Sequence, residues 1–172
     1  MTQIETLFTS NNNNPRLEKF LLMLVETRKR LFRQLEGISQ KNLDYSPNIN
    51  RIETIGTLLL HIAAIEWSYI FEDIDKKEMS YEKWKYAFAL REDLVPIQLT
   101  KKPLEFYTQI LNEVREEVLQ RLRKMNDSDL ENLINSDNRQ ITIEWILYHL
   151  NQHESVHIGQ INFLKRQSNI KV

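Results

Sequence analysis

Glycine and proline, the two residues that most readily turn a chain, are scarce in this sequence. Only three glycines and four prolines occur among its 172 residues, whereas the two together average roughly 12% of a protein. A β-sandwich or β-barrel needs such residues at hairpin after hairpin. The composition therefore disfavours an all-β fold and favours long helices.

Apolar residues recur every three or four positions in four long segments, which is the period of one helix face. Asn14 followed by Pro15 is typical of a helix start, because an asparagine side chain accepts an unpaired backbone N–H and proline lacks that hydrogen. The sequence predicts an all-α four-helix bundle, a single domain over residues 1–172 with residues 1–14 flexible or peripheral. The expected long helices are 15–37, 54–73, 103–122 and 142–164, with a shorter one at 80–88.

The segments between these helices are polar or contain proline. We expect connections at 43–50 and 91–100, one or two helical turns at 127–138, and no pair of β-strands. Residues 58–65 are apolar on nearly every face, which is typical of a central, buried helix. By contrast, we expect the charges around Arg115 and at 121–124 to lie on a solvated helix face.

Charge and composition exclude several functional classes. The 23 basic and 24 acidic side chains nearly cancel, which argues against nonspecific nucleic-acid binding. The absence of cysteine excludes a disulfide scaffold, a cysteine-ligated metal and a thiol nucleophile of the protein itself. Residues 1–15 lack the features of a signal peptide, and no apolar run is long enough to cross a bilayer. We expect a cytoplasmic protein without nucleic-acid or membrane partners, in which any metal is held by His, Asp or Glu.

Three of the four histidines, His149, His153 and His157, fall on one stripe of the last expected helix. Side chains four residues apart on a helix lie roughly 6 Å apart at their bases, so either neighbouring pair can bind one divalent ion. The fourth histidine, His61, lies in the apolar middle of the second helix. Because bundle metal sites are built between facing helices, we expect a three-histidine site that includes His61. The spacing does not choose between the two pairs on the last helix.

Residues 153–157 read His-Glu-Ser-Val-His, the pattern of zinc proteases in which the glutamate is the general base. The longer protease motif needs a third ligand downstream, but Gln160 stands three residues beyond His157, and no histidine, aspartate or glutamate follows. A protease is therefore disfavoured. Glu154 can instead approach water bound to the metal, support a metal ligand, or face solvent.

Two segments resemble the DinB/YfiT-like superfamily of four-helix-bundle metalloenzymes. They are residues 56–67 (GTLLLHIAAIEW) and 149–161 (HLNQHESVHIGQI). The family pattern is one histidine in the second helix, and then H-x-x-x-H followed closely by a Gly-Gln or similar pair. These motifs cover about 25 residues, whereas the order of long helices extends the resemblance over most of the chain.

The resemblance implies that His61, His153 and His157 are the metal ligands and that His149 is a neighbour. It implies a divalent ion, for which zinc, nickel and iron all suit an all-imidazole site, together with a small-molecule substrate and a homodimer. Some members transfer a low-molecular-weight thiol, such as bacillithiol or mycothiol, to an electrophile. Others are hydrolases or maleylpyruvate isomerases. Val156 and Ile158 replace the histidine and arginine of many relatives, so the resemblance does not extend to a basic substrate contact there.

These observations lead us to expect a metal-dependent enzyme, with thiol transfer as the favoured reaction, because three protein ligands leave a coordination position open. A metal-dependent hydrolase is one alternative. A non-catalytic metal-binding or stress-associated bundle is another, and its site would be closed. In a third, the histidines are hydrogen-bonded core residues of an interaction module.

Overall fold

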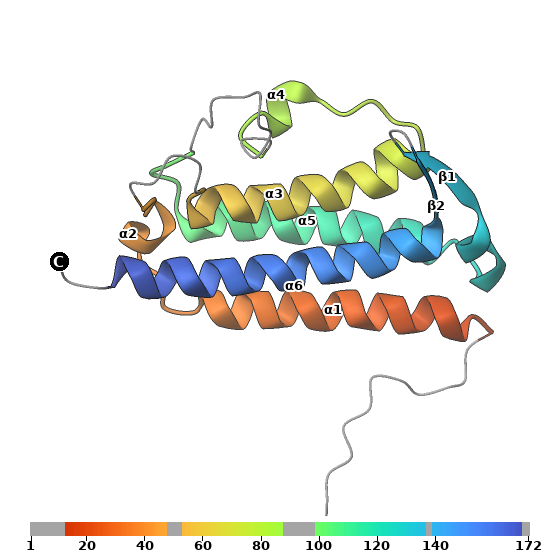
Figure 1. Ribbon diagram of the computed structural model, residues 1–172, viewed down its shortest axis with the longest axis horizontal. Coiled ribbons are helices and arrows are strands. Elements are labelled where there is room, and N and C mark those ends of the chain that lie inside the picture. Colours follow the sequence, from red (N-terminus) through yellow and green to blue (C-terminus); the bar gives the residue numbers. More distant parts are fainter. Residues whose placement is uncertain (1–12, 48–52, 88–98, 137–138, 170–172) are drawn as a thin grey trace, which may run out of the picture.

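The computed structural model of the chain describes residues 13–47, 53–87, 99–136 and 139–169. Four long helices run side by side along the long axis of the molecule (Figure 1). They are α1 (Pro15–Leu35), α3 (Ile55–Trp67), α5 (Leu104–Leu122) and α6 (Ile143–Ser168). Helix α3 packs against α5 and α6, and α1 packs against α6. The expected all-α four-helix bundle is confirmed.

Short elements extend or connect the long helices. The expected helix 54–73 is α3 followed by a π-helical segment, Ser68–Ile74. Helix α2 (Gln40–Leu43) follows α1, and α4 (Tyr81–Trp84) begins where Ser80 accepts the backbone N–H of Lys83. The expectations for residues 1–12, 48–50, 88 and 91–98 lie outside the described residues.

A β-hairpin stands where the sequence predicted only helical turns, so that prediction was wrong in part. A 3₁₀ turn, Asp127–Glu131, is present, but β1 (Leu133–Ser136) and β2 (Arg139–Thr142) then pair antiparallel. Each strand has only four residues, which is too short to show a clear alternation of apolar and polar side chains. The pair is oriented by one apolar contact, since Ile134 lies opposite the buried Ile141. Strand β2 then leads directly into α6 (Figure 1).

The first turn of α1 is capped by a residue distant in sequence. The Asn14 side chain makes no cap hydrogen bond within the helix, contrary to the prediction. Instead, the Asp127 carboxylate accepts the backbone N–H groups of Arg16 at 3.0 Å and Leu17 at 2.9 Å. The Asn14 Oδ1 atom accepts the N–H of Asp127 at 3.2 Å. A carboxylate at a helix N-terminus also opposes the positive end of the helix dipole, so the segment before β1 holds α1 in place.

Helix α3 is the central element of the bundle. Eleven of its 13 residues are buried, as its apolar composition predicted. At its first turn the backbone passes so close to the ring of Tyr107 that only glycine fits, at Gly56. Tyr107 is itself fully buried. Among the described residues, no helix combines the length and apolar character that would let it cross a membrane.

We predict that Gly56→Ala lowers the free energy of unfolding by about 2 kcal/mol, the usual cost of overpacking. The new methyl carbon would lie 2.6 Å from Cζ of Tyr107 and closer still to its hydroxyl oxygen. Denaturant unfolding followed by circular dichroism measures the change. The matched control is Gly159→Ala in α6, where a methyl group meets no atom within 4 Å. The control should gain up to about 1 kcal/mol from helix propensity. Equal stability of the two variants would contradict the close contact.

Candidate metal centre

Three histidines from two helices meet at one point of the bundle. His61 comes from the middle of α3, and His153 and His157 come from successive turns of α6. The Nε2 atom of His153 lies 3.2 Å from that of His61 and 3.0 Å from that of His157. One ligand nitrogen from each ring lies within 4.8 Å of the other two. Of the two pairs that the spacing allowed on α6, the structure therefore brings His153 and His157 to His61.

Two of the three rings are held by an acceptor on the side away from this point. His61 donates its Nδ1–H to the backbone carbonyl of Ala87 at 2.9 Å. His157 donates its Nδ1–H to Oε1 of Gln160, one turn further along α6, at 2.6 Å. A carbonyl oxygen can only accept, so each bond places the ring's hydrogen on Nδ1 and leaves a lone pair on Nε2. Such contacts orient imidazole ligands in metal proteins.

The donor set fits a divalent cation. Lone pairs of His61 and His157 both point at Nε2 of His153, and one hydrogen on that atom can satisfy only one of them. A cation satisfies all three nitrogens at once. Nitrogens at the corners of a tetrahedron around zinc, each about 2.05 Å from the ion, lie about 3.3 Å apart. The distances of 3.0 and 3.2 Å are close to that value.

Burial keeps these imidazoles neutral, the form that binds metal. It is the main cause that lowers the pKa of His61 to about 4, with the charge of His157 adding to the effect. Burial likewise lowers the pKa of His153 to about 2, together with repulsion from the other histidines. The pKa of His157 is also lowered by burial, although Gln160 partly opposes the change. Near neutral pH the cluster therefore presents lone pairs rather than protons.

His149 belongs to an aromatic cluster beside the centre. Its ring stacks on Trp145 at 4.9 Å with an interplanar angle of 7°, and it meets Tyr69 edge-on at 5.1 Å. The ring centroid lies 5.8 Å from that of His153, and the group of converging ligand atoms does not include His149. The guanidinium carbon of Arg139 lies 4.4 Å from the centroid of the Trp145 ring. His149 thus lies beside the three converging histidines and outside their group.

Glu154 lies in a buried ring of four charges, one from each long helix. The ring consists of Arg28, Glu66, Arg115 and Glu154, all at most 6% exposed. Arg28 donates to Glu154 at 2.7 Å and to Glu66 at 2.8 Å, and Arg115 donates to Glu154 at 2.6 Å and pairs with Glu66 as well. Burial alone would raise the pKa of Glu154, but the two guanidinium groups outweigh it and lower that pKa. Glu154 therefore neither faces solvent nor is free to act as a base.

The prediction for Arg115 was wrong. Its neighbours Glu116 and Glu117 are exposed as expected, but Arg115 points into the bundle. The helical period contained the signal, because Arg115 follows Leu111 by one turn and precedes Leu119 by one turn, and both are buried. A charge on an apolar face requires opposite charges on the facing helices. Those partners lie 49 and 39 residues away, which a single sequence does not reveal.

A pocket of about 530 Å³ lies between the start of α3 and the second half of α6, and none of the three converging histidines lines it. Gln160, which holds His157, is one of its lining residues. The wall is mostly apolar, and it includes Phe163, a large apolar residue that is 54% exposed. The complete lining is Glu53, Leu58, Val156, Gly159, Gln160, Phe163 and Leu164. Partial burial raises the pKa of the one carboxyl group there, Glu53.

We predict that Glu154→Gln lowers the free energy of unfolding by about 3 kcal/mol, because it leaves two buried guanidinium groups with one carboxylate. Chemical denaturation near neutral pH measures the loss. The control is Glu144→Gln on the same helix, where the ion pair with Arg16 is 40% exposed on the glutamate side. Its loss should cost at most about 1 kcal/mol. A Glu154→Gln protein as stable as the control would show that the ring contributes little.

Comparison with known proteins agrees with this geometry. The model of the DinB superfamily matches residues 23–161, which is most of the chain and includes all three converging histidines. No match is found among the curated proteins. The matched region extends from the third turn of α1 to about two turns before the end of α6. The chain therefore belongs to the DinB superfamily.

Proposed function

We propose that the protein is a divalent-metal-dependent enzyme with His61, His153 and His157 as its metal ligands. The observation that carries this proposal is the convergence of three Nε2 atoms with their lone pairs directed at one point. Membership of the DinB superfamily supports it. Zinc, nickel and iron all suit three imidazoles, so the proposal does not depend on which of them is bound.

Catalysis rather than metal storage is supported by access. His153 is only half-buried, unlike its two partners. A pocket of about 530 Å³ lies behind His157, where Gln160 is part of its lining, and its volume is within the size range of small-molecule sites. Three protein ligands also leave at least one coordination position for a substrate. A purely structural metal would be enclosed by four protein ligands, and the described residues supply three at this point.

Transfer of a low-molecular-weight thiol to an electrophile is the reaction that we favour. When bound, a divalent ion lowers the pKa of a thiol or water at its open position. Hydrolysis also profits from a base that takes a proton from water, but Glu154, the carboxylate next to His153 in sequence, is held by Arg28 and Arg115. A thiol that ionises readily needs no such base. The absence of cysteine from the chain requires the thiol to come from a cosubstrate.

The proposed function first predicts that the protein binds a metal ion. Untagged protein that has been stripped with a chelator should take up one Zn²⁺ or Ni²⁺ per chain, as measured by elemental analysis. Because the pKa values of His61 and His153 are lowered to about 4 and 2, binding near pH 7 should release no proton from these two rings, and at most about one from a metal-bound water. Isothermal titration calorimetry in buffers of different ionisation enthalpy measures this number.

The variants His153→Ala and His149→Ala separate the ligand role from a general effect on the aromatic cluster. His153→Ala should weaken metal binding by more than about 100-fold, above the loss typical when only a partner of a ligand is removed. His149→Ala should retain one ion per chain. Unchanged metal binding in His153→Ala would refute the proposed centre, and release of two or more protons per ion would contradict a neutral cluster, because a metal-bound water supplies at most about one.

The proposed function also predicts a reaction that can be assayed. Metal-loaded protein should accelerate the conjugation of bacillithiol or mycothiol with a fluorogenic electrophile. The stripped protein and His153→Ala should give the uncatalysed rate, because the thiol then keeps its ordinary pKa. Activity in His149→Ala is the control for folding. If the metal-loaded protein does not accelerate the conjugation of either thiol but cleaves an activated ester, the hydrolase alternative replaces thiol transfer. If it does neither, the non-catalytic alternative is favoured.

A further inference from the structure

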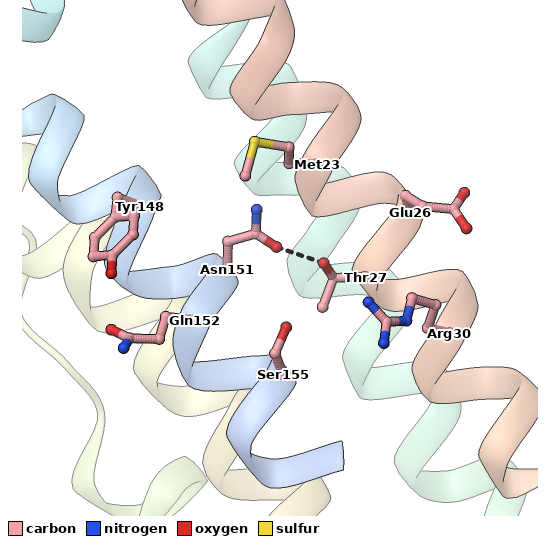
Figure 2. A pocket seen from close by; sticks show the side chains of 8 residues that line it. All are labelled: Met23, Glu26, Thr27, Arg30, Tyr148, Asn151, Gln152 and Ser155. Atoms are coloured by element: carbon pink, nitrogen blue, oxygen red, sulfur yellow. Dashed lines mark hydrogen bonds between the residues drawn. The ribbon is translucent and has the colours of Figure 1, made fainter. Parts of the chain in front are cut away.

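A second concave site lies between α1 and α6, away from the residues that converge on the metal centre. It is a groove of about 330 Å³, and Figure 2 shows its side chains from close by. Half of the lining comes from each helix. The lining residues are Met23, Glu26, Thr27 and Arg30 of α1, and Tyr148, Asn151, Gln152 and Ser155 of α6. None of them belongs to the histidine cluster, the charge ring or the pocket beside Gln160.

The floor of the groove carries an amide that lacks a protein partner for its N–H groups. Thr27 and Asn151 are only 6% and 8% exposed. The Thr27 hydroxyl donates to Oδ1 of Asn151 at 2.5 Å, and no hydrogen bond joins Nδ2 of Asn151 to any described residue. No fully enclosed side-chain nitrogen of the described residues lacks a partner, so Nδ2 is open to the groove. In Figure 2 this nitrogen points toward the end of the Met23 side chain.

The rim carries an unpaired positive charge. Arg30 has no carboxylate within ion-pair distance among the described residues. Glu26, one turn earlier on α1, instead pairs with Arg33 at 3.2 Å and contacts Lys29 at 3.9 Å. Figure 2 shows Glu26 turned away from α6, whereas the Arg30 guanidinium extends toward Ser155. The groove therefore presents a cation together with neutral donors, and its nearest carboxylate is already occupied.

We propose that this groove binds a small organic carboxylate. The Arg30 guanidinium and the Asn151 amide donate to the carboxylate oxygens, and hydrogen bonds to an ionised acceptor are about twice as strong as neutral ones. Met23 and the ring of Tyr148 form apolar walls. The carbon skeleton of an organic acid can pack against them, whereas an inorganic anion cannot. The volume is at the lower end of the range for ligand sites, which limits the ligand to a small acid. The site is independent of the metal and of the proposed reaction.

Succinate is a suitable probe, with inorganic phosphate at equal ionic strength as the comparison. The full chain is first stripped with a chelator, so that neither anion can bind through a metal. The side-chain amide signal of Asn151 in ¹H–¹⁵N spectra, identified by its absence from Asn151→Ser, reports on the floor of the groove. Succinate should shift this signal saturably in the millimolar range, and phosphate should shift it much less.

Arg30→Gln should weaken succinate binding by about tenfold, the usual effect of losing a charge-assisted hydrogen bond. The matched control is Arg166→Gln, which removes the same charge from an exposed position in the last turn of α6, outside the groove. It should leave the affinity within about twofold. An Asn151 signal that does not move overturns the proposal. So does equal weakening in both variants, or an equal response to phosphate, because each indicates only nonspecific anion binding.

Discussion

The arrangement of this bundle depends on the buried ring of Arg28, Glu66, Arg115 and Glu154. Each long helix contributes one member, and each guanidinium bridges both carboxylates. Sliding any one helix along its axis would leave charges buried without a partner, which costs several kcal/mol. The ring therefore holds the four helices in one axial register. Apolar packing alone would fix that register less strictly, since leucine and isoleucine contacts tolerate rearrangement.

The candidate metal centre is a consequence of that register. Glu154 follows His153 directly, and Glu66 lies five residues after His61, so the pairing of α3 with α6 through the ring also sets the distance between the histidines. The carbonyl of Ala87, from outside the two helices, then orients the ring of His61, and Gln160 of α6 orients that of His157. The charges of the ring balance one another, so a divalent ion held by the neutral imidazoles would add two positive charges at this level of the bundle.

Much of this architecture could be predicted from the chain alone. The helical period located the long helices, and the histidine stripe together with the resemblance selected the residues that meet. What escaped prediction depends on contacts between distant segments. A backbone carbonyl such as that of Ala87 has no signature in a sequence, and Asp127 is separated by more than a hundred residues from the helix that it caps. Arg115 looked solvated because its partners are on other helices, and the four-residue strands are too short for a recognisable pattern.

X-ray absorption spectroscopy of the zinc-loaded protein tests the central claim most directly, because it reports the ligands of the ion itself. We expect the scattering of three imidazole rings with nitrogens about 2.05 Å from zinc, and at least one further light atom at the open position. His61→Ala should reduce the count to two, although this residue lies 92 positions from the next ligand in the chain. A site with fewer than three imidazoles, or an unchanged spectrum without His61, would contradict the account.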